Sequence, residues 1–186
     1  MTSNVNTKTR FKVVDLAYIG LFVALMAICS WISVPTAVPF TLQTFAIFTA
    51  IGLLGGKRGT ISILLYLMIG AVGVPVFAGF KSGPGALFGM TGGYLIGFIF
   101  TGLIMWGITA AFGKKLYILA IADVIGLIVC YAFGTVWFSY LYFGQINAAS
   151  IGSSLSMCVI PFIIPDLCKI GISLMLVSRL RKYISE

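Results

Sequence analysis

The sequence predicts an all-α integral membrane protein with six transmembrane helices, and its composition and charge pattern carry that prediction. Hydrophobic residues make up 60% of the 186-residue chain and charged residues only 9%, whereas charged residues form about a quarter of an ordinary soluble domain. The mean hydropathy is +1.13. Basic residues stand in short clusters between apolar stretches, which argues against nucleic-acid binding despite a net charge of +8.

The apolar stretches define the predicted spans of a single membrane domain that covers residues 1–186. Most of them approach the length that a helix needs to cross a bilayer. They are expected at about residues 13–33, 41–55, 60–72, 94–112, 116–143 and 157–177. Pro35 and Pro39 end the first helix, because proline lacks the backbone N–H donor that a continuing helix requires. The small polar stretch 144–156 is expected to be a loop.

Residues 73–93, between the third and fourth spans, form a long interruption rich in glycine, proline and aromatic residues. A solvated linker would be more polar. Irregular apolar backbone is tolerated at membrane depth where it is buried in protein or lines a cavity. We therefore expect a long structured loop that acts as a lid or pocket wall.

The basic residues predict the orientation of the chain. With six spans, both termini lie on one side, together with the following residues: Lys8, Arg10, Lys12, Lys57, Arg58, Lys114, Lys115, Arg179, Arg181 and Lys182. By the positive-inside rule this side is the cytoplasm, so the loop 73–93 is extracellular. Of the twelve basic residues, only Lys81 and Lys169 are predicted elsewhere.

Asp166 and Lys169 place two opposite charges inside the last apolar stretch. A charge near the centre of a span costs roughly 2.5–3.5 kcal/mol on insertion scales, so such a residue is by default a functional-site hypothesis. A spacing of three puts both side chains on one helix face, where they can pair or contact one ligand together. A salt bridge that only packs the helix is the alternative. An anionic ligand entering from outside would account for Lys169 and for Lys81, although Lys81 could equally be a solvated loop charge.

Two further polar residues are candidates for a role within the membrane. Gln43 could hydrogen-bond a polar ligand or a neighbouring helix. Asp123 could bind an ion, but pairing with Lys114 or Lys115 near the membrane interface is the favoured interpretation.

Small residues recur on the first span at offsets of three and four: Ala17, Gly20, Ala24 and Ala27. Such a stripe lets another helix approach closely. The approaching helix could belong to the same bundle or to a partner membrane subunit.

Several kinds of chemistry lack support. Cys29, Cys130, Cys158 and Cys168 stand singly in apolar sequence and are expected to be small buried hydrophobic residues. The chain has no histidine and no C-x-x-C pair, so no metal site, cofactor or catalytic residue is predicted. The segment 52–57 lacks the spacing of a P-loop, so ATP hydrolysis would have to come from partners.

Four segments together carry a resemblance to a known family. They read Val-Pro-Phe-Thr-Leu-Gln at 38–43, Gly-Ala-Val-Gly-Val-Pro-Val-Phe-Ala at 70–78, Thr-Gly-Gly-Tyr-Leu-Ile-Gly-Phe at 91–98 and Pro-Asp-x-x-Lys at 165–169. In this order they resemble the BioY family, the biotin-specific substrate-binding (S) subunits of energy-coupling-factor (ECF) vitamin transporters. The resemblance covers nearly the whole chain.

The resemblance implies a high-affinity biotin-binding subunit of an ATP-driven importer in a prokaryotic plasma membrane. Such a subunit captures biotin outside and works with a transmembrane coupling (T) subunit and two cytoplasmic ATPase subunits. The implied substrate-binding residues are Asp166, Lys169, Gln43, Phe77, Lys81, Thr91, Gly92, Gly93 and Tyr94. Partner docking is assigned to Ala17, Gly20, Ala24 and Ala27, with Gly20-x-x-x-Ala24 nearest to the Ala-x-x-x-Ala docking pattern of some S subunits.

Two other functions remain open from the sequence alone. The chain could be a self-sufficient, ion-coupled secondary transporter in which Asp123 and Asp166 bind protons or ions, although no inverted repeat is visible. It could also be an S subunit for another small vitamin. An intramembrane enzyme is not favoured, because the chain offers no nucleophile with a partnered base.

Overall fold

The structure is a computed structural model that describes residues 12–36 and 38–184. Its first half begins with helix α1 (Val13–Trp31), followed by strands β1 (Ser33–Val34) and β2 (Phe40–Thr41). The two strands pair antiparallel, with Ser33 opposite Thr41. Helices α2 (Gln43–Leu54) and α3 (Gly56–Val72) follow, and Gly55 alone separates them. The β1–β2 pair connects the end of α1 to the start of α2.

The second half contains the loop region and the longest helices. A 3-10 turn η1 (Ala78–Phe80) and a short helix α4 (Pro84–Leu87) lie within residues 73–91. Three long or medium helices and one short helix follow: α5 (Gly92–Phe112), α6 (Leu116–Phe143), α7 (Ala148–Cys158) and α8 (Ile160–Ile184). The predicted loop is therefore ordered by short helical turns.

Four helices in the described part of the chain are long and apolar enough to cross a membrane: α1, α5, α6 and α8. Helix α2 is apolar but has 12 residues, roughly 18 Å at 1.5 Å per residue, which is shorter than a hydrocarbon core of about 30 Å. The predicted all-α membrane fold is confirmed at this level.

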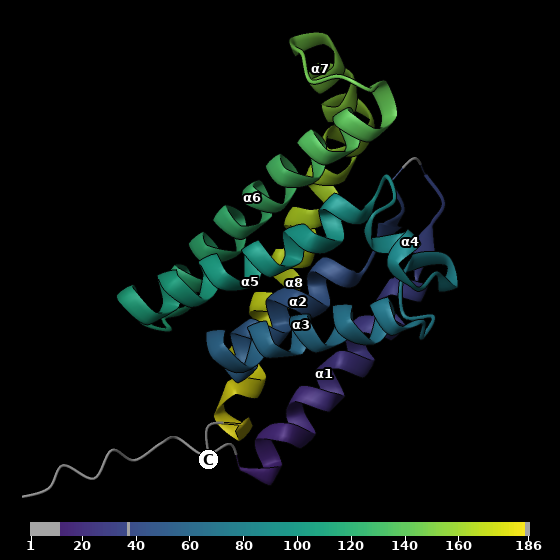
Figure 1. Ribbon diagram of the computed structural model, residues 1–186. Helices are drawn as coiled ribbons and strands as arrows, with labels where there is room; N and C mark the ends of the chain where they lie inside the picture. The colour runs from purple at the N-terminus through teal and green to yellow at the C-terminus, as the bar shows by residue number, and fades with distance from the viewer. Residues whose placement is uncertain (1–11, 37, 185–186) are drawn as a thin grey trace, which may run out of the picture.

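Helices α5 and α6 lie side by side, and glycines let them approach closely (Figure 1). A Cβ atom on Gly93 would lie 2.3 Å from Trp137 Cβ, and one on Gly134 would lie 2.3 Å from Tyr94 Cδ1. Both distances are shorter than side chains tolerate, so these positions accept only glycine without repacking. Helix α2 packs against α8, and α1 covers α2 and α3.

The predicted loop at 144–156 is wrong, because most of it forms α7. Asn147 starts this helix with a capping box. Its side chain accepts a hydrogen bond from the Ser150 amide at 2.8 Å, and the Ser150 hydroxyl accepts one from the Asn147 amide at 3.0 Å. This reciprocal pair satisfies donors that would otherwise be unpaired at a helix start.

Two other predicted boundaries shift by four residues or more. Helix α3 already begins at Gly56, four residues before the expected start of the third span at residue 60. Helix α8 continues past residue 177 to Ile184. Arg181 and Lys182 lie in its last turn, where positive charge interacts favourably with the helix dipole.

The start of α1 and the end of α8 lie at the same end of the molecule, and α7 lies at the opposite end (Figure 1). Arg181 binds together three segments at the shared end. It donates to the backbone carbonyl of Gly52 at 3.0 Å and to that of Lys114. Basic residues from the α5–α6 turn and from α8 are thus gathered in one place.

Candidate ligand-binding site

Asp166 and Lys169 form a buried ion pair on α8, with Lys169 Nζ 2.7 Å from Asp166 Oδ1. Only 4% of Asp166 and 6% of Lys169 is exposed. The spacing of three residues puts both on one face of the helix, as the sequence predicted. Two charges at this depth need further polar partners to offset their lost hydration.

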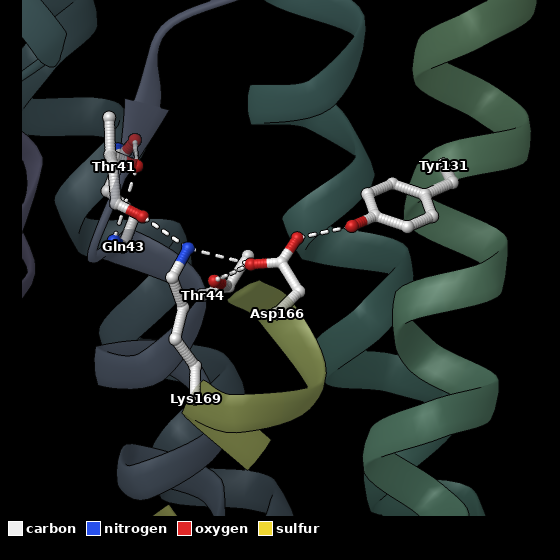
Figure 2. A network of polar contacts seen from close by, with 6 residues as sticks. All are labelled: Thr41, Gln43, Thr44, Tyr131, Asp166 and Lys169. Carbon is white, nitrogen blue, oxygen red and sulfur yellow. Dashed lines mark hydrogen bonds and ion pairs between the residues drawn. The ribbon is translucent and has the colours of Figure 1, made fainter. Parts of the chain in front are cut away.

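Both charges have such partners, and these come from other parts of the chain (Figure 2). Lys169 Nζ also donates to the Thr41 carbonyl at 2.6 Å and lies 4.0 Å from the centroid of the Phe40 ring. Asp166 accepts from Thr44 Oγ1 at 3.0 Å and from the Tyr131 hydroxyl. Strand β2 and helices α2, α6 and α8 therefore converge on the pair.

Gln43 belongs to an adjoining chain of hydrogen bonds. Its Nε2 donates to the Tyr66 hydroxyl at 2.6 Å, and its Oε1 accepts from Thr41 Oγ1 at 2.9 Å. Tyr66 in turn donates to the Val76 carbonyl at 2.9 Å. Of the two roles left open for Gln43, the interhelical hydrogen bond is present, and it links α2 to α3 and to the following loop.

A cavity adjoins the ion pair and is walled by segments from both halves of the chain. Asp166, Lys169 and Gln43 supply charged and polar lining, while most of the wall is apolar. The aromatic members of the lining are Phe40, Phe77, Tyr94, Phe98, Tyr131 and Phe162. A largely apolar wall with a few convergent polar groups is typical of small-molecule sites.

Residues 77–94 contribute to this cavity, and their first five residues form a closed turn. The Phe77 amide donates to the Lys81 carbonyl at 3.0 Å, and both side chains line the cavity together with those of Thr91 and Tyr94. Lys81 is exposed, unlike Lys169. The lining of the cavity therefore includes one exposed cation, Lys81, and one buried cation, Lys169 beside Asp166.

Gly92 and Gly93 do not line the cavity. Both glycines are closely packed. A Cβ on Gly92 would lie 1.7 Å from the Leu87 carbonyl oxygen, and Gly93 lies against Trp137. The absent side chain of Gly92 lets α5 begin close to α4, and that of Gly93 lets α5 pack closely on α6.

The sequence reasoning missed Tyr131 and Thr44 as partners of Asp166. Tyr131 stands in an apolar helix, and nothing in the local sequence separates it from other tyrosines on α6. Thr44 directly follows Gln43 at the start of α2. Its closeness to this predicted site residue could have indicated that Thr44 also belongs to the site. Cys130 and Cys158 also line the cavity.

The predicted pairing of Asp123 with Lys114 or Lys115 is wrong. Asp123 is 1% exposed, and its Oδ1 has no hydrogen-bond partner. The ion pairs in the described part of the chain join Arg58 to Asp15 and Lys169 to Asp166. From Lys115 to Asp123 the helix rises about 12 Å. This rise separates the Asp123 carboxyl group from Lys114 and Lys115.

Two other predictions need partial correction. Cys29, Cys130 and Cys158 are buried, but Cys168 is exposed because it lies on the outer face of α8. On α1, Ala17, Gly20 and Ala24 are exposed, whereas Ala27 is buried in the core. The small-residue stripe is thus only partly available to another helix.

Comparisons with known proteins agree with the resemblance carried by the four segments. The BioY family model matches residues 2–186. A biotin transporter BioY of Thermotoga maritima is 38% identical over 164 residues, covering 88% of this chain and 93% of that protein. A probable biotin transporter BioY of Pyrococcus horikoshii is 38% identical over 171 residues, covering 91% and 98%.

A solved structure extends this agreement to the fold. The 2.1 Å crystal structure of the S-component for biotin from an ECF-type ABC transporter matches with a TM-score of 0.80 and 28% sequence identity. The match covers 98% of this chain and 95% of that chain. The chain belongs to the BioY family.

Proposed function

We propose that this multi-pass membrane protein is the biotin-binding S component of an ECF-type vitamin importer. The observation that carries the proposal is the buried Asp166–Lys169 pair beside a largely apolar cavity, in a chain whose relatives are biotin transporters. The protein binds and delivers its ligand and performs no chemical reaction on it. Biotin is a ligand here and not a cofactor.

The remaining hydrogen-bonding capacity of the ion pair fits a cyclic urea. Lys169 has three N–H donors, of which two are used by Asp166 and the Thr41 carbonyl. Asp166 has about four acceptor positions, and Lys169, Thr44 and Tyr131 occupy three. One donor and one acceptor are left, which match the carbonyl and an N–H of the ureido ring of biotin.

The rest of the cavity accounts for the other parts of biotin. Aromatic side chains such as Phe40, Phe77 and Phe162 form an apolar wall for the thioether ring. Lys81, which is exposed and also lines the cavity, would bind the carboxylate of the valeryl tail by charge. This orientation puts the ureido ring deepest and the tail towards the loop region 73–91.

The proposed topology has six spans with both termini in the cytoplasm. In it, α2 and α3 are the two shorter spans, connected at Gly55. The clustered basic residues at the shared end of α1 and α8 favour the cytoplasmic side for that end. The cavity then opens outwards, where Lys81 lies.

The proposed partners are a T subunit and two cytoplasmic ATPase subunits. The chain contains no P-loop of its own. The docking face proposed for the T subunit is the exposed part of the α1 stripe, formed by Ala17, Gly20 and Ala24. Small exposed residues on a membrane helix allow close approach of a second helix.

Equilibrium binding of radiolabelled biotin to the purified full-length protein tests the function, with riboflavin and thiamine as competitors. We expect tight biotin binding that neither competitor displaces. Displacement by another vitamin would reassign the ligand while keeping the S-component function. Absence of binding by a folded sample would contradict the proposal and leave Asp166–Lys169 as a structural ion pair.

A further inference from the structure

A second cavity lies at the end of the molecule where α1 begins and α8 ends. It is enclosed by the start of α1, the α2–α3 connection and the last part of α5. Its lining includes four basic residues and one acidic residue: Lys12, Lys57, Arg58, Lys114 and Asp15. None of these residues lines the cavity beside Asp166, so the two cavities are separate.

The charges in this second cavity are unbalanced. Asp15 Oδ1 lies 3.0 Å from Arg58 Nη2, and Asp15 Oδ2 accepts from the Lys12 backbone amide at 3.0 Å. Asp15, the one carboxylate among the described residues of the lining, is thus already paired with Arg58. The ammonium groups of Lys12 and Lys114 lie in the same lining, and their positive charge attracts an anion.

The start of α3 adds backbone donors to the same cavity. Gly55 and Gly56 both line it, and the first turn of this 17-residue helix has no side-chain cap. The first N–H groups of a helix have no partner within the helix, and together with the helix dipole they favour a bound anion. Gly56 also permits the close packing of α3 on α5, because a Cβ there would lie 2.5 Å from Trp106 Cα.

The surroundings of the cavity place it at a membrane surface. Trp106 lines it from α5, one of the helices long enough to span a membrane, and is 38% exposed. Tryptophan is enriched at the level of lipid headgroups. Basic pockets between membrane helices bind anionic headgroups by charge. We propose that this cavity binds the phosphate of an anionic phospholipid.

This inference goes beyond biotin binding. The assignment of the lipid to the cytoplasmic leaflet is the one part of it that rests on the proposed topology. The lipid phosphate would contact Lys12, Lys114 and the first turn of α3. Arg58 would stay paired with Asp15. The lipid would thereby hold together the ends of α1, α3 and α5.

A pair of charge-matched variants tests the proposal. Lys12→Gln with Lys114→Gln removes two cations from the cavity. Lys115→Gln with Arg179→Gln removes two exposed cations that do not line it. Native mass spectrometry of the full-length protein in nonionic detergent, titrated with phosphatidylglycerol or phosphatidylcholine, measures lipid binding. We expect phosphatidylglycerol binding to weaken about thirtyfold in the first variant and to stay unchanged in the second.

The other outcomes would overturn the proposal. Equal weakening in both variants would mean diffuse surface charge. If millimolar inorganic phosphate displaced bound phosphatidylglycerol as effectively as added lipid does, the cavity would be a site for free phosphate. If the first variant bound lipid normally but no longer assembled with the T subunit, the cavity would bind an acidic segment of a protein partner. Biotin binding reports folding, and if the double variant fails to fold, Lys114→Gln and Lys115→Gln are compared as single changes.

Discussion

Asp166 and Asp123 are two buried aspartates on membrane-spanning helices, exposed by 4% and 1%, and their surroundings differ in almost every other respect. Asp166 accepts hydrogen bonds from Lys169, Thr44 and Tyr131 and borders a cavity. Asp123 has an unpartnered Oδ1 and lines neither of the cavities described above. Burial of an acidic group in a membrane helix therefore does not by itself indicate a ligand site.

The difference lies in what each residue does for the fold. The partners of Asp166 come from α2, α6 and α8 and include the cation that balances it. Loss of one partner should disturb both the fold and the ligand site, because the same atoms serve both. Asp123 offers no such coupling, so its loss should disturb neither.

The largest effect is expected for Asp166→Asn. The change leaves Lys169 as a buried cation without its counter-ion, and breaking a buried pair in this way typically costs about 3–5 kcal/mol of stability. Biotin affinity should fall by at least about tenfold, since a hydrogen bond to a charged group contributes roughly 1.5–3 kcal/mol. Thermal unfolding in detergent and biotin binding measure the two effects.

Two companion variants separate fold from binding. Asp166→Asn with Lys169→Met removes both charges, so it should recover much of the lost stability while biotin binding stays weak. Cys168→Ala changes an exposed residue between them in sequence and should alter neither property. Wild-type biotin affinity in the folded double variant would show that the ion pair is structural only.

An intermediate effect is expected for Tyr131→Phe, which removes the hydroxyl donor to Asp166 Oδ2 and keeps the aromatic wall. The unfolding free energy should fall by about 1.5 kcal/mol. Biotin affinity should fall less than in Asp166→Asn, because Lys169 and Thr44 still hold the carboxylate. Tyr140→Phe, at an exposed position of the same helix, is the matched control, and equal effects of the two changes would contradict the assigned role of Tyr131.

The same two aspartates show what could be predicted from the sequence. The long helices were predictable from apolar length, and α6 has the predicted bounds 116–143. Asp166 and Lys169 were recognisable because two charges three residues apart interrupt an apolar stretch. Helix α7 was not predicted, because its many serines are typical of a loop. The capping pair of Asn147 and Ser150 could have indicated the start of a helix.

The partners of each aspartate were not predictable in the same way. The orientation of α6 about its own axis decides which of its tyrosines faces Asp166. Packing of α6 on α5 sets this orientation, for example where Gly134 contacts Tyr94. The proposed pairing of Asp123 with a lysine used closeness in sequence, which does not set closeness in space along a helix. Long-range contacts need the packed bundle, and the sequence alone does not provide it.

The smallest effect is expected for Asp123→Leu, which replaces an unpartnered buried carboxyl group with an apolar side chain of similar size. Replacing a buried polar group that has no partner is neutral or stabilising, so the melting temperature should stay constant or rise, and biotin affinity should not change. Under the proposed function, in which ATP hydrolysis by partner subunits drives import, uptake by the reconstituted importer should also persist. Lost uptake with intact biotin binding and an intact fold would instead assign Asp123 an ion-coupling role, and would revive the secondary-transporter alternative that the sequence left open.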